Sequence, residues 1–471
     1  MTDFVGRTSE IRSLQRLLDR VRETIGQGVP GRCLLVRGRR RVGKSRLLSH
    51  FCETSGLPYV FFTASKQGGH EPALFADEVA ASTLPGRELL REATPGSWDA
   101  ALRLLTAALD ERSPAIVVID EFPYLAEGDA TIEATFQKQW DRLLSKRPVL
   151  LVLVGSDLAM MEALGTHGRP LYQRGTEMVV GPLSPAETGT IVGARSAADA
   201  FDAYLVTGGL PLICGEWGRG QTMWRHLERA LAEPTSPLIV SAERVLAAEF
   251  PVEAQARVVL GQVGAGEVTF TTIARAAGGL QRASANRSLE LLMTKRMVAK
   301  DLPLSTLPSG EARYRVTDPY LRFWLRFIGP HMAEIERGRG DRVLARIKEG
   351  WVAWRGKAIE PVIREALCRL SPITGLPAAG HVGGYWTRTN VPEIDVIAGD
   401  ASPVATRLAY AGTVKWLDNK PLTQADVNRL LADLTSVPGA DPDLPIVAVS
   451  RTTVTARGVT ALDPDDLIAA W

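Results

Sequence analysis

Short apolar runs separated by helix-like segments dominate the first part of the chain. Four such runs, at 33–36, 59–62, 115–119 and 149–154, contain no charged residue. Runs of this length are typical of strands that are buried on both faces of a sheet. The segments between them are long enough for helices, and several place apolar residues at helical spacing. This alternation predicts an α/β fold built on a parallel sheet.

The turn after the first run has the spacing of a phosphate-binding P-loop. It reads Gly38-x-x-x-x-Gly43-Lys44-Ser45, between a predicted strand and a helix predicted over 45–51. Its backbone N–H groups and the helix N-terminus favour an anion. Lys44 is predicted to reach the β- and γ-phosphates of ATP, and the Ser45 hydroxyl to hold Mg²⁺. The other residues of the motif that we expect to contact the nucleotide are Arg39, Arg40, Arg41, Val42 and Arg46.

Two further turns are candidates for the rim of this nucleotide site. Phe4-Val-Gly-Arg7 leads into a segment with the helical pattern Ile11, Leu14, Leu17, Leu18 and Val21, which would place Arg7 on the adenine side. Thr207-Gly-Gly-Leu-Pro211 interrupts a later helical segment, and Pro211 is its candidate contact. The alternatives are a plain packing helix in the first case and ordinary helix punctuation in the second.

The third apolar run ends in two acids, Asp120 and Glu121. A buried parallel strand delivers such residues to the carboxyl edge of the sheet, where α/β folds bind ligands. Asp120 is predicted to complete the Mg²⁺ shell, and Glu121 to polarise the attacking water. An acidic strand end is a weak signal alone, but it becomes a strong one when it follows a P-loop in the same strand–helix alternation.

The fourth run ends in Ser156, which we expect at the same edge, either near the γ-phosphate or as the cap of the next helix. Arg174, with Arg169 in reserve, is the candidate that would neutralise γ-phosphate charge, in cis or from a neighbouring subunit. A solvated surface arginine is the alternative for both.

The middle of the chain predicts a helical lid over 185–263 and a winged helix over 264–328. The second segment has a strand end and a helix within 269–277, a Gly278-Gly279 turn, a helix over 284–294 and a ribbon made of 297–301 and 313–316. A second helix in this arrangement suits the DNA major groove. The candidate DNA-binding residues are Arg282, Arg287, Lys295 and Arg296, with Lys300 nearby. A packing or protein-contact module is the alternative.

The tail, 329–471, predicts a separate α/β unit. Glu360 lies on a predicted helix, Asp395 on a strand at 393–397, and Lys415 on a strand at 409–416 that would form a hairpin with it. An acid on a helix, an acid on one strand and a lysine on the next would together suit metal-assisted cleavage of a phosphodiester.

The overall composition restricts the expected cellular location of the protein but does not indicate a particular ligand. The chain has 55 basic and 53 acidic residues, a formal charge of +2, so any DNA-binding surface must be local. Its four scattered cysteines form neither a zinc motif nor a disulfide framework. With no signal peptide and no bilayer-spanning apolar run, we expect a cytoplasmic protein that is not associated with membranes. The oligomeric state stays open, a homo-oligomer included.

Taken together, these residues resemble the archaeal-type ATPase family, a STAND-like branch of the AAA+ superfamily that is also found in bacteria. The resemblance covers essentially the whole chain. Its markers are Phe4-Val-Gly-Arg7, the P-loop, Ile119-Asp-Glu-Phe-Pro-Tyr-Leu125, Gly155-Ser156, Leu171-Tyr-Gln-Arg174, Gly208-Gly-Leu-Pro211 and 314–324. It implies ATPase roles for Lys44, Ser45, Asp120 and Glu121, and a C-terminal DUF234-type domain that resembles the PD-(D/E)XK, or restriction-endonuclease-like, fold.

The tail departs from that nuclease pattern at one position. The resemblance places Glu360, Asp395 and Lys415 on the pattern, which also has an acid two residues before the lysine. This chain has Thr413 there. A hydroxyl brings no charge and is a poor replacement for a carboxylate as a Mg²⁺ ligand. We therefore expect the nuclease fold without efficient cleavage.

The sequence is compatible with three functions. The first is an ATP-hydrolysing switch that acts on DNA and carries a degenerate nuclease-like domain. The second is an active ATP-dependent DNA nuclease for genome defence or DNA processing. The third is a signalling or scaffold ATPase triggered by protein, which would show no salt-dependent affinity for DNA. The predicted domains are 1–184 (P-loop core), 185–263 (lid), 264–328 (winged helix) and 329–471 (nuclease-like).

Overall fold

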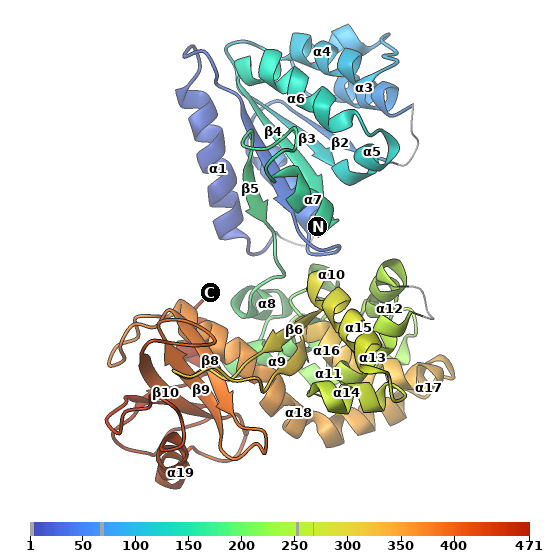
Figure 1. The fold of residues 1–471 in the computed structure, drawn as a ribbon. Helices are drawn as coiled ribbons and strands as arrows, with labels where there is room; N and C mark the ends of the chain where they lie inside the picture. The colour runs from blue at the N-terminus through green and yellow to red at the C-terminus, as the bar shows by residue number, and fades with distance from the viewer. Residues whose placement is uncertain (1–3, 66–69, 251–253, 267) are drawn as a thin grey trace. The chain divides into compact units, whose positions relative to one another are not determined.

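The computed structural model describes residues 4–65, 70–250, 254–266 and 268–471. The chain divides into two compact units, Met1–Pro182 and Leu183–Trp471, which Figure 1 shows in blue to green and in green to red. The predicted boundaries near 263 and 328 fall inside the second unit, and this finer division stays a prediction.

The first unit is built on a five-stranded sheet in the order β2-β3-β4-β1-β5, in which every neighbouring pair is parallel. Every residue of β3 and β4 is buried, as expected for strands covered on both faces. The strands are β1 (Arg32–Arg37), β2 (Tyr59–Thr63), β3 (Ala115–Asp120), β4 (Val149–Gly155) and β5 (Thr176–Val179). Because β4 lies between β1 and β3, the P-loop, Ser156 and the two acids all follow adjacent strand ends.

Helices of the first unit cover this sheet, and their apolar residues form its core. Phe62, Phe75, Trp98, Phe122 and Phe136 are linked by ring contacts with centroids 5.2–6.0 Å apart. The helices are α1 (Thr8–Glu23), α2 (Lys44–Thr54), α3 (Glu71–Ala81), α4 (Trp98–Ala108), α5 (Phe122–Gly128), α6 (Ile132–Arg142) and α7 (Leu158–Leu164), with 3₁₀ turns at Arg87–Leu90 and Leu144–Lys146.

The second unit begins with a helical segment and continues into a helix–turn–helix with a ribbon. Gly278 and Gly279 form the turn at φ 89° and 72°, in the left-handed region that glycine adopts without strain. The helices are α8 (Pro185–Val192), α9 (Ala197–Thr207), α10 (Pro211–Glu216), α11 (Met223–Ala232), α12 (Pro237–Glu249), α13 (Gln255–Ala265), α14 (Phe270–Ala276) and α15 (Arg282–Thr294). The antiparallel ribbon is β6 (Val298–Asp301) and β7 (Arg313–Val316).

A second five-stranded sheet, in the order β12-β11-β10-β9-β8, forms the C-terminal part. Its β8–β9 and β9–β10 pairs are antiparallel, and its β10–β11 and β11–β12 pairs are parallel. The strands are β8 (His381–Trp386), β9 (Glu393–Gly399), β10 (Leu408–Lys415), β11 (Ile446–Ser450) and β12 (Thr460–Leu462). The helices are α16 (Pro319–Phe327), α17 (Met332–Glu336), α18 (Gly340–Arg369), α19 (Gln424–Leu434) and α20 (Pro464–Ile468), with a 3₁₀ turn at Gly329–His331.

The loop that joins the ribbon strands is packed into this C-terminal sheet. Leu304 is fully buried in the hydrophobic core beneath β8 to β11, and its N–H donates to the Gly384 carbonyl at 2.9 Å. Farther along, Arg313 of β7 stacks on Trp386 at 4.5 Å and donates to Glu393 at 2.9 Å. The ribbon and its loop, the predicted wing, are therefore held by the C-terminal sheet rather than projecting into solvent.

A buried ion network also ties the helical segment to the C-terminal sheet. Arg355 on α18 is 2% exposed and donates to Asp202 on α9 and to Asp418. Arg451 donates to Asp202 at 2.8 Å. Burial raises the pKa of Asp202, and the two arginines oppose that effect. Such a network holds its elements in one arrangement, because removing one partner leaves a buried charge unpaired.

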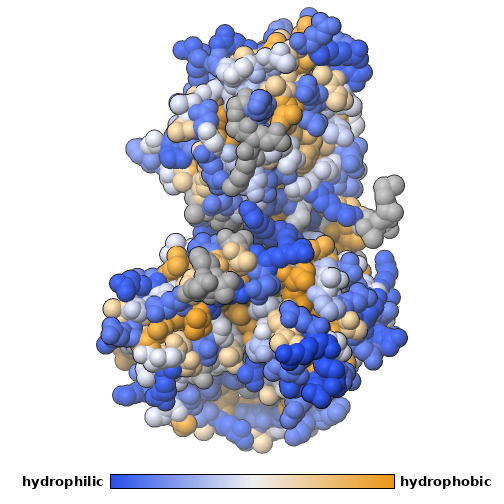
Figure 2. All heavy atoms as spheres, turned by 90° about the vertical axis from the view of Figure 1, so that its right-hand side faces the viewer, coloured by the Kyte–Doolittle hydropathy of each residue, from blue (hydrophilic) through white to orange (hydrophobic). Residues whose placement is uncertain are grey.

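The surface drawn in Figure 2 is mainly hydrophilic, with hydrophobic residues in scattered patches. Among the described residues, no helix combines the length and the apolar character needed to cross a membrane. The predicted fold class is confirmed: an α/β protein with a parallel P-loop core, helical elements and a separate C-terminal sheet.

Candidate functional site

The P-loop turns sharply between β1 and α2, and two of its glycines are required by its geometry. Gly43 has φ 89° and directly precedes α2. A Cβ on Gly38 would lie 2.3 Å from the carbonyl oxygen of Val180, so no larger residue fits there. Arg41 adopts φ 70°, an uncommon conformation for a residue with a side chain. The backbone of the loop is thus fixed in a tight curve between β1 and α2.

Lys44 is buried at the base of this loop. Its side chain is 6% exposed, and Nζ donates to the carbonyls of Gly38 at 2.8 Å and Arg39 at 3.0 Å. Burial lowers the pKa of Lys44, and the carboxylates of Glu121 and Asp120 oppose this. A cation held by carbonyl dipoles beside two acids can exchange those dipoles for phosphate oxygens.

The acids at the end of β3 lie beside the P-loop. The Ser45 hydroxyl donates to Oδ2 of Asp120 at 2.5 Å, and the N–H of Glu121 donates to Oδ1 at 2.9 Å. Asp120 is 3% exposed, and burial raises its pKa. The Ser45 hydroxyl and the Asp120 carboxylate are therefore placed together, as the two protein ligands of a P-loop Mg²⁺ ion must be.

Glu121 and Ser156 form a second pair at the same edge. The Ser156 hydroxyl donates to Oε1 of Glu121 at 2.6 Å. Glu121 directly precedes α5 with φ 53°, a left-handed conformation that costs energy in a residue other than glycine and is concentrated at functional sites. The cap of α7 is Asp157, which accepts from Met160 N–H. Ser156 thus contacts the acid instead of capping that helix.

The chemistry of this edge fits ATP with Mg²⁺. One hydroxyl and one carboxylate are available to a hard cation, which takes its remaining ligands from phosphates and water. Nη1 of Arg41 is buried and forms no hydrogen bond within the described part of the chain, and an anion would supply the acceptor. The Ser45–Asp120 pair and the buried Arg41 nitrogen are therefore the two observations that support binding of ATP with Mg²⁺ here.

The other predicted nucleotide contacts lie around the loop in different roles. Arg7 is buried, with its guanidinium donating to the carbonyls of Val42 and Gly181 at 2.7 Å each and pairing with Glu10. It therefore braces the P-loop. Arg40 is exposed and donates to the Tyr124 hydroxyl at 3.2 Å. Arg46 is exposed in the first turn of α2.

Both candidate arginine fingers form ion pairs within the first unit. Arg174 binds both oxygens of Asp141, with Nε at 2.8 Å from Oδ1, and this pairing raises its pKa. Arg169 pairs with Glu133. Either would have to leave its carboxylate to reach a phosphate, so the finger stays a prediction.

Pro211 belongs to the second unit, as the first residue of α10. The turn before it is tightly packed there, since a Cβ on Gly209 would lie 2.0 Å from the Leu183 carbonyl oxygen. Its relation to the nucleotide stays a prediction.

The predicted DNA-binding residues divide into two groups. Arg282 and Arg287 are exposed along one face of α15, together with Asn286. Lys295 instead pairs with Glu249 at 2.6 Å and lies 5.4 Å from the Phe250 ring centre. Arg296 is exposed, with φ 54° just after the helix. The exposed face of α15 is the surface that can reach a groove.

Two of the predicted nuclease-like residues, Glu360 and Lys415, form ion pairs with neighbouring side chains. Glu360 contacts Lys357 at 3.1 Å and Arg364 at 3.2 Å, and burial raises its pKa. Lys415 pairs with Asp426 at 2.7 Å.

Asp395 accepts from the Val414 N–H at 2.9 Å and from the Thr413 hydroxyl at 3.3 Å. No group of three or more acid, histidine or cysteine side chains in the described residues could hold a metal. These residues do not fit a divalent metal site.

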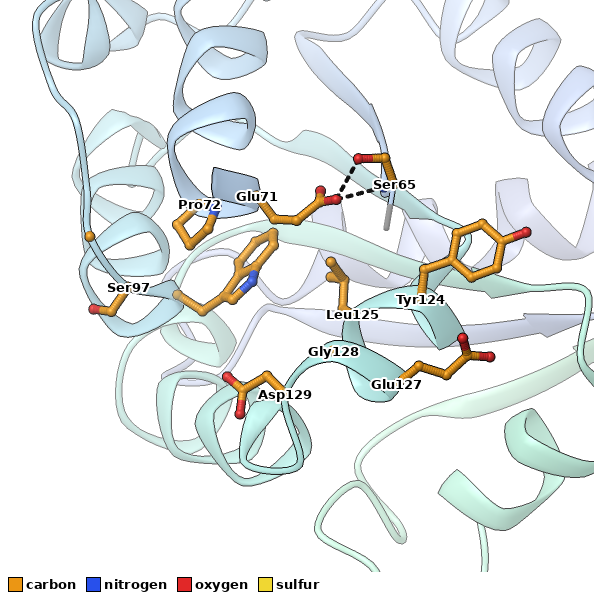
Figure 3. A pocket seen from close by; sticks show the side chains of 11 residues that line it. Ser65, Glu71, Pro72, Ser97, Tyr124, Leu125, Glu127, Gly128 and Asp129 are labelled. Carbon is orange, nitrogen blue, oxygen red and sulfur yellow. Dashed lines mark hydrogen bonds between the residues drawn. The ribbon is translucent and has the colours of Figure 1, made fainter. Parts of the chain in front are cut away.

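Two features of the structure were not predicted from the sequence. One is the Arg313–Glu393–Lys357 cluster, in which Lys357 donates to Glu393 at 3.0 Å. The other is a cavity of about 520 Å³ beside α5, lined by Ser65, Tyr124 and Leu125 among other residues (Figure 3). Neither feature has a sequence motif. The charges of Arg313 and Glu393 are apparent from the sequence, but their contact is not.

The chain is similar to a protein family and to several known proteins. Residues 324–430 match the DUF234 family, described as archaeal and bacterial proteins of unknown function. An uncharacterized protein of Methanocaldococcus jannaschii, MJECL04, is 25% identical over 444 residues, covering 92% of this chain and 91% of its own. A second from that organism, MJ0424, is 31% identical over 88 residues, covering 19% of this chain and 79% of its own.

Two solved structures of archaeal proteins align with part of this chain. The Walker-type ATPase PABY2304 of Pyrococcus abyssi aligns with a TM-score of 0.47 and 20% identity, over 69% of this chain and 96% of that one. The Aeropyrum pernix ORC2 protein, in ADPNP and ADP complexes, aligns with a TM-score of 0.45 and 14% identity, over 74% and 96%.

The sheet order and the P-loop edge are those of a P-loop NTPase fold of the AAA+ type. The chain belongs to the archaeal-type ATPases that carry a DUF234 domain at their C-terminus.

Proposed function

We propose that this protein binds ATP with Mg²⁺ at the P-loop, hydrolyses it, and uses the cycle as a switch. The observation that carries the proposal is the pairing at the carboxyl edge of the first sheet. Ser45 lies 2.5 Å from Asp120 and Ser156 lies 2.6 Å from Glu121. The first pair would hold the metal ion, and the second would orient the base. Phosphoryl transfer to water needs both functions close together.

Each residue has a distinct part in this mechanism. When bound, Mg²⁺ neutralises charge that develops on the phosphates. Ser45 and Asp120 would hold that ion, and Lys44 would exchange its loop carbonyls for phosphate oxygens. Glu121 accepts the proton of the attacking water, and Ser156 fixes the direction of the Glu121 carboxylate.

The test is steady-state ATP turnover together with nucleotide affinity. Lys44→Ala is expected to lose tight ATP binding, and Glu121→Gln to retain binding while turnover stalls. Wild-type turnover in Glu121→Gln would remove the base assignment and leave the binding site intact.

We further propose that the switch acts on duplex DNA through the exposed face of α15. Arg282, Asn286 and Arg287 there supply side chains that suit base edges and phosphates. Such coupling requires DNA to bind the two nucleotide states with different affinity. Turnover measured with and without duplex and branched DNA tests it. Turnover indifferent to every DNA, without salt-sensitive binding, would favour a protein-triggered ATPase.

The DUF234 domain, in this proposal, keeps a nuclease-like arrangement without cutting DNA. Support comes from the pairing of Glu360 with Lys357 and Arg364, and from Thr413 beside Asp395. We expect no cleavage of duplex or branched DNA with Mg²⁺ or Mn²⁺. Cleavage that disappears in Lys415→Ala would instead establish an active nuclease.

A further inference from the structure

Positive charge is concentrated in the first 50 residues of the chain. They contain 12 basic and 4 acidic residues, which leaves 43 of the 55 basic and 49 of the 53 acidic residues for the remainder. Part of this charge belongs to the P-loop and its helix. Most of the rest lies on α1, which packs on β1 and β4 at one side of the first unit (Figure 1). A local excess of this kind in a nearly neutral chain indicates an anionic partner.

Three arginines form a stripe along the outer face of α1. Arg12, Arg16 and Arg20 are all exposed and follow one another at four-residue intervals, about 6 Å apart along the helix axis. Residues at this spacing share one face of a helix. The buried face, with Leu14 and Leu18, lies on the opposite side of α1. The arginine stripe is therefore directed away from the core of the first unit.

The three guanidinium groups of the stripe lack a counter-ion on the protein. Within the described part of the chain, none of them forms an ion pair or a hydrogen bond. Two acids of α1 are already engaged, since Glu10 pairs with Arg7 and Asp19 pairs with Arg22. Glu23, in the last turn, is the third acid of this helix. Like charges four residues apart destabilise a helix, and a bound anion would relieve that repulsion.

We propose that the arginine stripe of α1 binds the phosphate backbone of duplex DNA. Guanidinium groups bind phosphate oxygens through two parallel hydrogen bonds. A duplex presents one negative charge about every 1.7 Å along its axis, so a regular row of exposed arginines meets a regular row of phosphates. The acidic side chains of a protein partner have no such fixed repeat. Contacts to phosphates carry no sequence information, and the stripe would add affinity without sequence preference.

This inference rests on the DNA part of the proposed function and extends it. The face of α15 supplies a DNA surface in the second unit, and the stripe supplies another in the unit that carries the P-loop. Helix α1 begins directly after Arg7, whose guanidinium donates to the carbonyls of Val42 and Gly181. DNA on the stripe would thus contact the helix that Arg7 connects to the P-loop.

The experiment measures binding of the full chain to a fluorescein-labelled duplex by anisotropy, over roughly 50 to 200 mM salt. One variant replaces the three stripe arginines by glutamine, and a second replaces them by lysine. Both substitutes are good helix formers, so α1 is expected to stay folded, which circular dichroism checks. The matched control makes the same change of charge with glutamine at three exposed basic residues elsewhere in the first unit: Arg112, Arg142 and Lys146.

We expect the glutamine variant to bind about tenfold or more weakly at the lower salt concentration. Its salt slope should be shallower by up to about 3, at roughly 0.9 for each lost phosphate contact. The loss should be the same on duplexes of unrelated sequence. The lysine variant should keep most of the slope, and the control should match wild type. An equal loss in the control, or a full slope in the glutamine variant, would overturn the proposal.

The same measurements separate this inference from the proposed function. If Arg287→Ala on α15 reduces the salt slope and the glutamine variant of α1 does not, DNA binding stands and the role of the stripe is refuted. If the wild-type chain shows no salt-sensitive binding to any duplex, both are refuted, and an acidic protein surface becomes the alternative partner of the stripe.

Discussion

The hydroxyl of Ser156 donates a 2.6 Å hydrogen bond to Oε1 of Glu121, joining the ends of β4 and β3. This contact orients one carboxylate oxygen and leaves the other for water. It also ties the candidate base to the strand that lies beside the P-loop strand. The base is thus positioned by the sheet itself and by one side chain.

Removing that hydroxyl is expected to slow hydrolysis without weakening ATP binding. In Ser156→Ala, Glu121 loses the donor that fixes its direction, and a hydrogen bond to a charged group contributes roughly 1.5–3 kcal/mol. We expect kcat to fall by about tenfold or more with nucleotide affinity unchanged. Ser156→Thr retains a hydroxyl and is the control. An unchanged kcat in the alanine variant would show that Glu121 is oriented by other contacts.

Asp120 is expected to destabilise the nucleotide-free protein. Burial raises its pKa, so the ionised form is less favourable in the folded than in the unfolded chain. Asp120→Asn should therefore raise the unfolding temperature at neutral pH while abolishing hydrolysis, and it can still accept from Ser45.

The pH dependence of this rise in unfolding temperature tests the explanation. The difference in unfolding temperature between Asp120→Asn and wild type should shrink as the pH falls through the raised pKa of the folded state toward the ordinary aspartate pKa. Below that value Asp120 is protonated in both the folded and the unfolded wild-type chain. Thermal unfolding in the presence of a metal chelator at neutral and acidic pH measures it. A gain that is the same at every pH would rule out ionisation of Asp120 as its source.

The sequence was sufficient for the P-loop edge because strand ends in a parallel sheet converge by geometry. An apolar run ending in Asp120 and one ending before Ser156 could be assigned to the same edge without knowing side-chain positions. The fold class was predicted for the same reason. The hydrogen bond between Ser156 and Glu121 needed the strand order, which the sequence does not state.

In the second unit, several contacts could not be predicted from the sequence. Leu304 lies in a loop with proline and serine residues, and its burial depends on a sheet that begins at His381. Strands β8 and β12 were not predicted, because short strands lack a distinctive pattern. Lys415 was assigned to the nuclease-like pattern from its place on a predicted strand and from the family resemblance, whereas its contact with Asp426 depends on where α19 packs.

The two groups of basic residues near α15 should respond differently in DNA binding. Arg287 is exposed on the helix face, whereas Lys295 is held by Glu249 and Phe250. Arg287→Ala should weaken duplex binding and, if the contact is to a phosphate, reduce the salt slope by about 1. Lys295→Ala should leave the slope unchanged. Equal losses in both variants would mean that Lys295 leaves its partners on binding.

Docking of the wing predicts a large stability difference between two leucines of one loop. Leu304 is fully buried in the C-terminal core, and Leu307 is 60% exposed. Truncation of a buried leucine leaves a cavity and typically costs about 2–5 kcal/mol, whereas an exposed position costs little.

We therefore expect Leu304→Ala to lower the free energy of unfolding of the second unit by that amount, and Leu307→Ala to leave it nearly unchanged. Chemical denaturation of the full chain, followed by tryptophan fluorescence, measures both. Equal stability of the two variants would mean that the loop does not dock in solution. In that case the wing would be free to join α15 on DNA, and the salt slope of wild-type binding would include its charges.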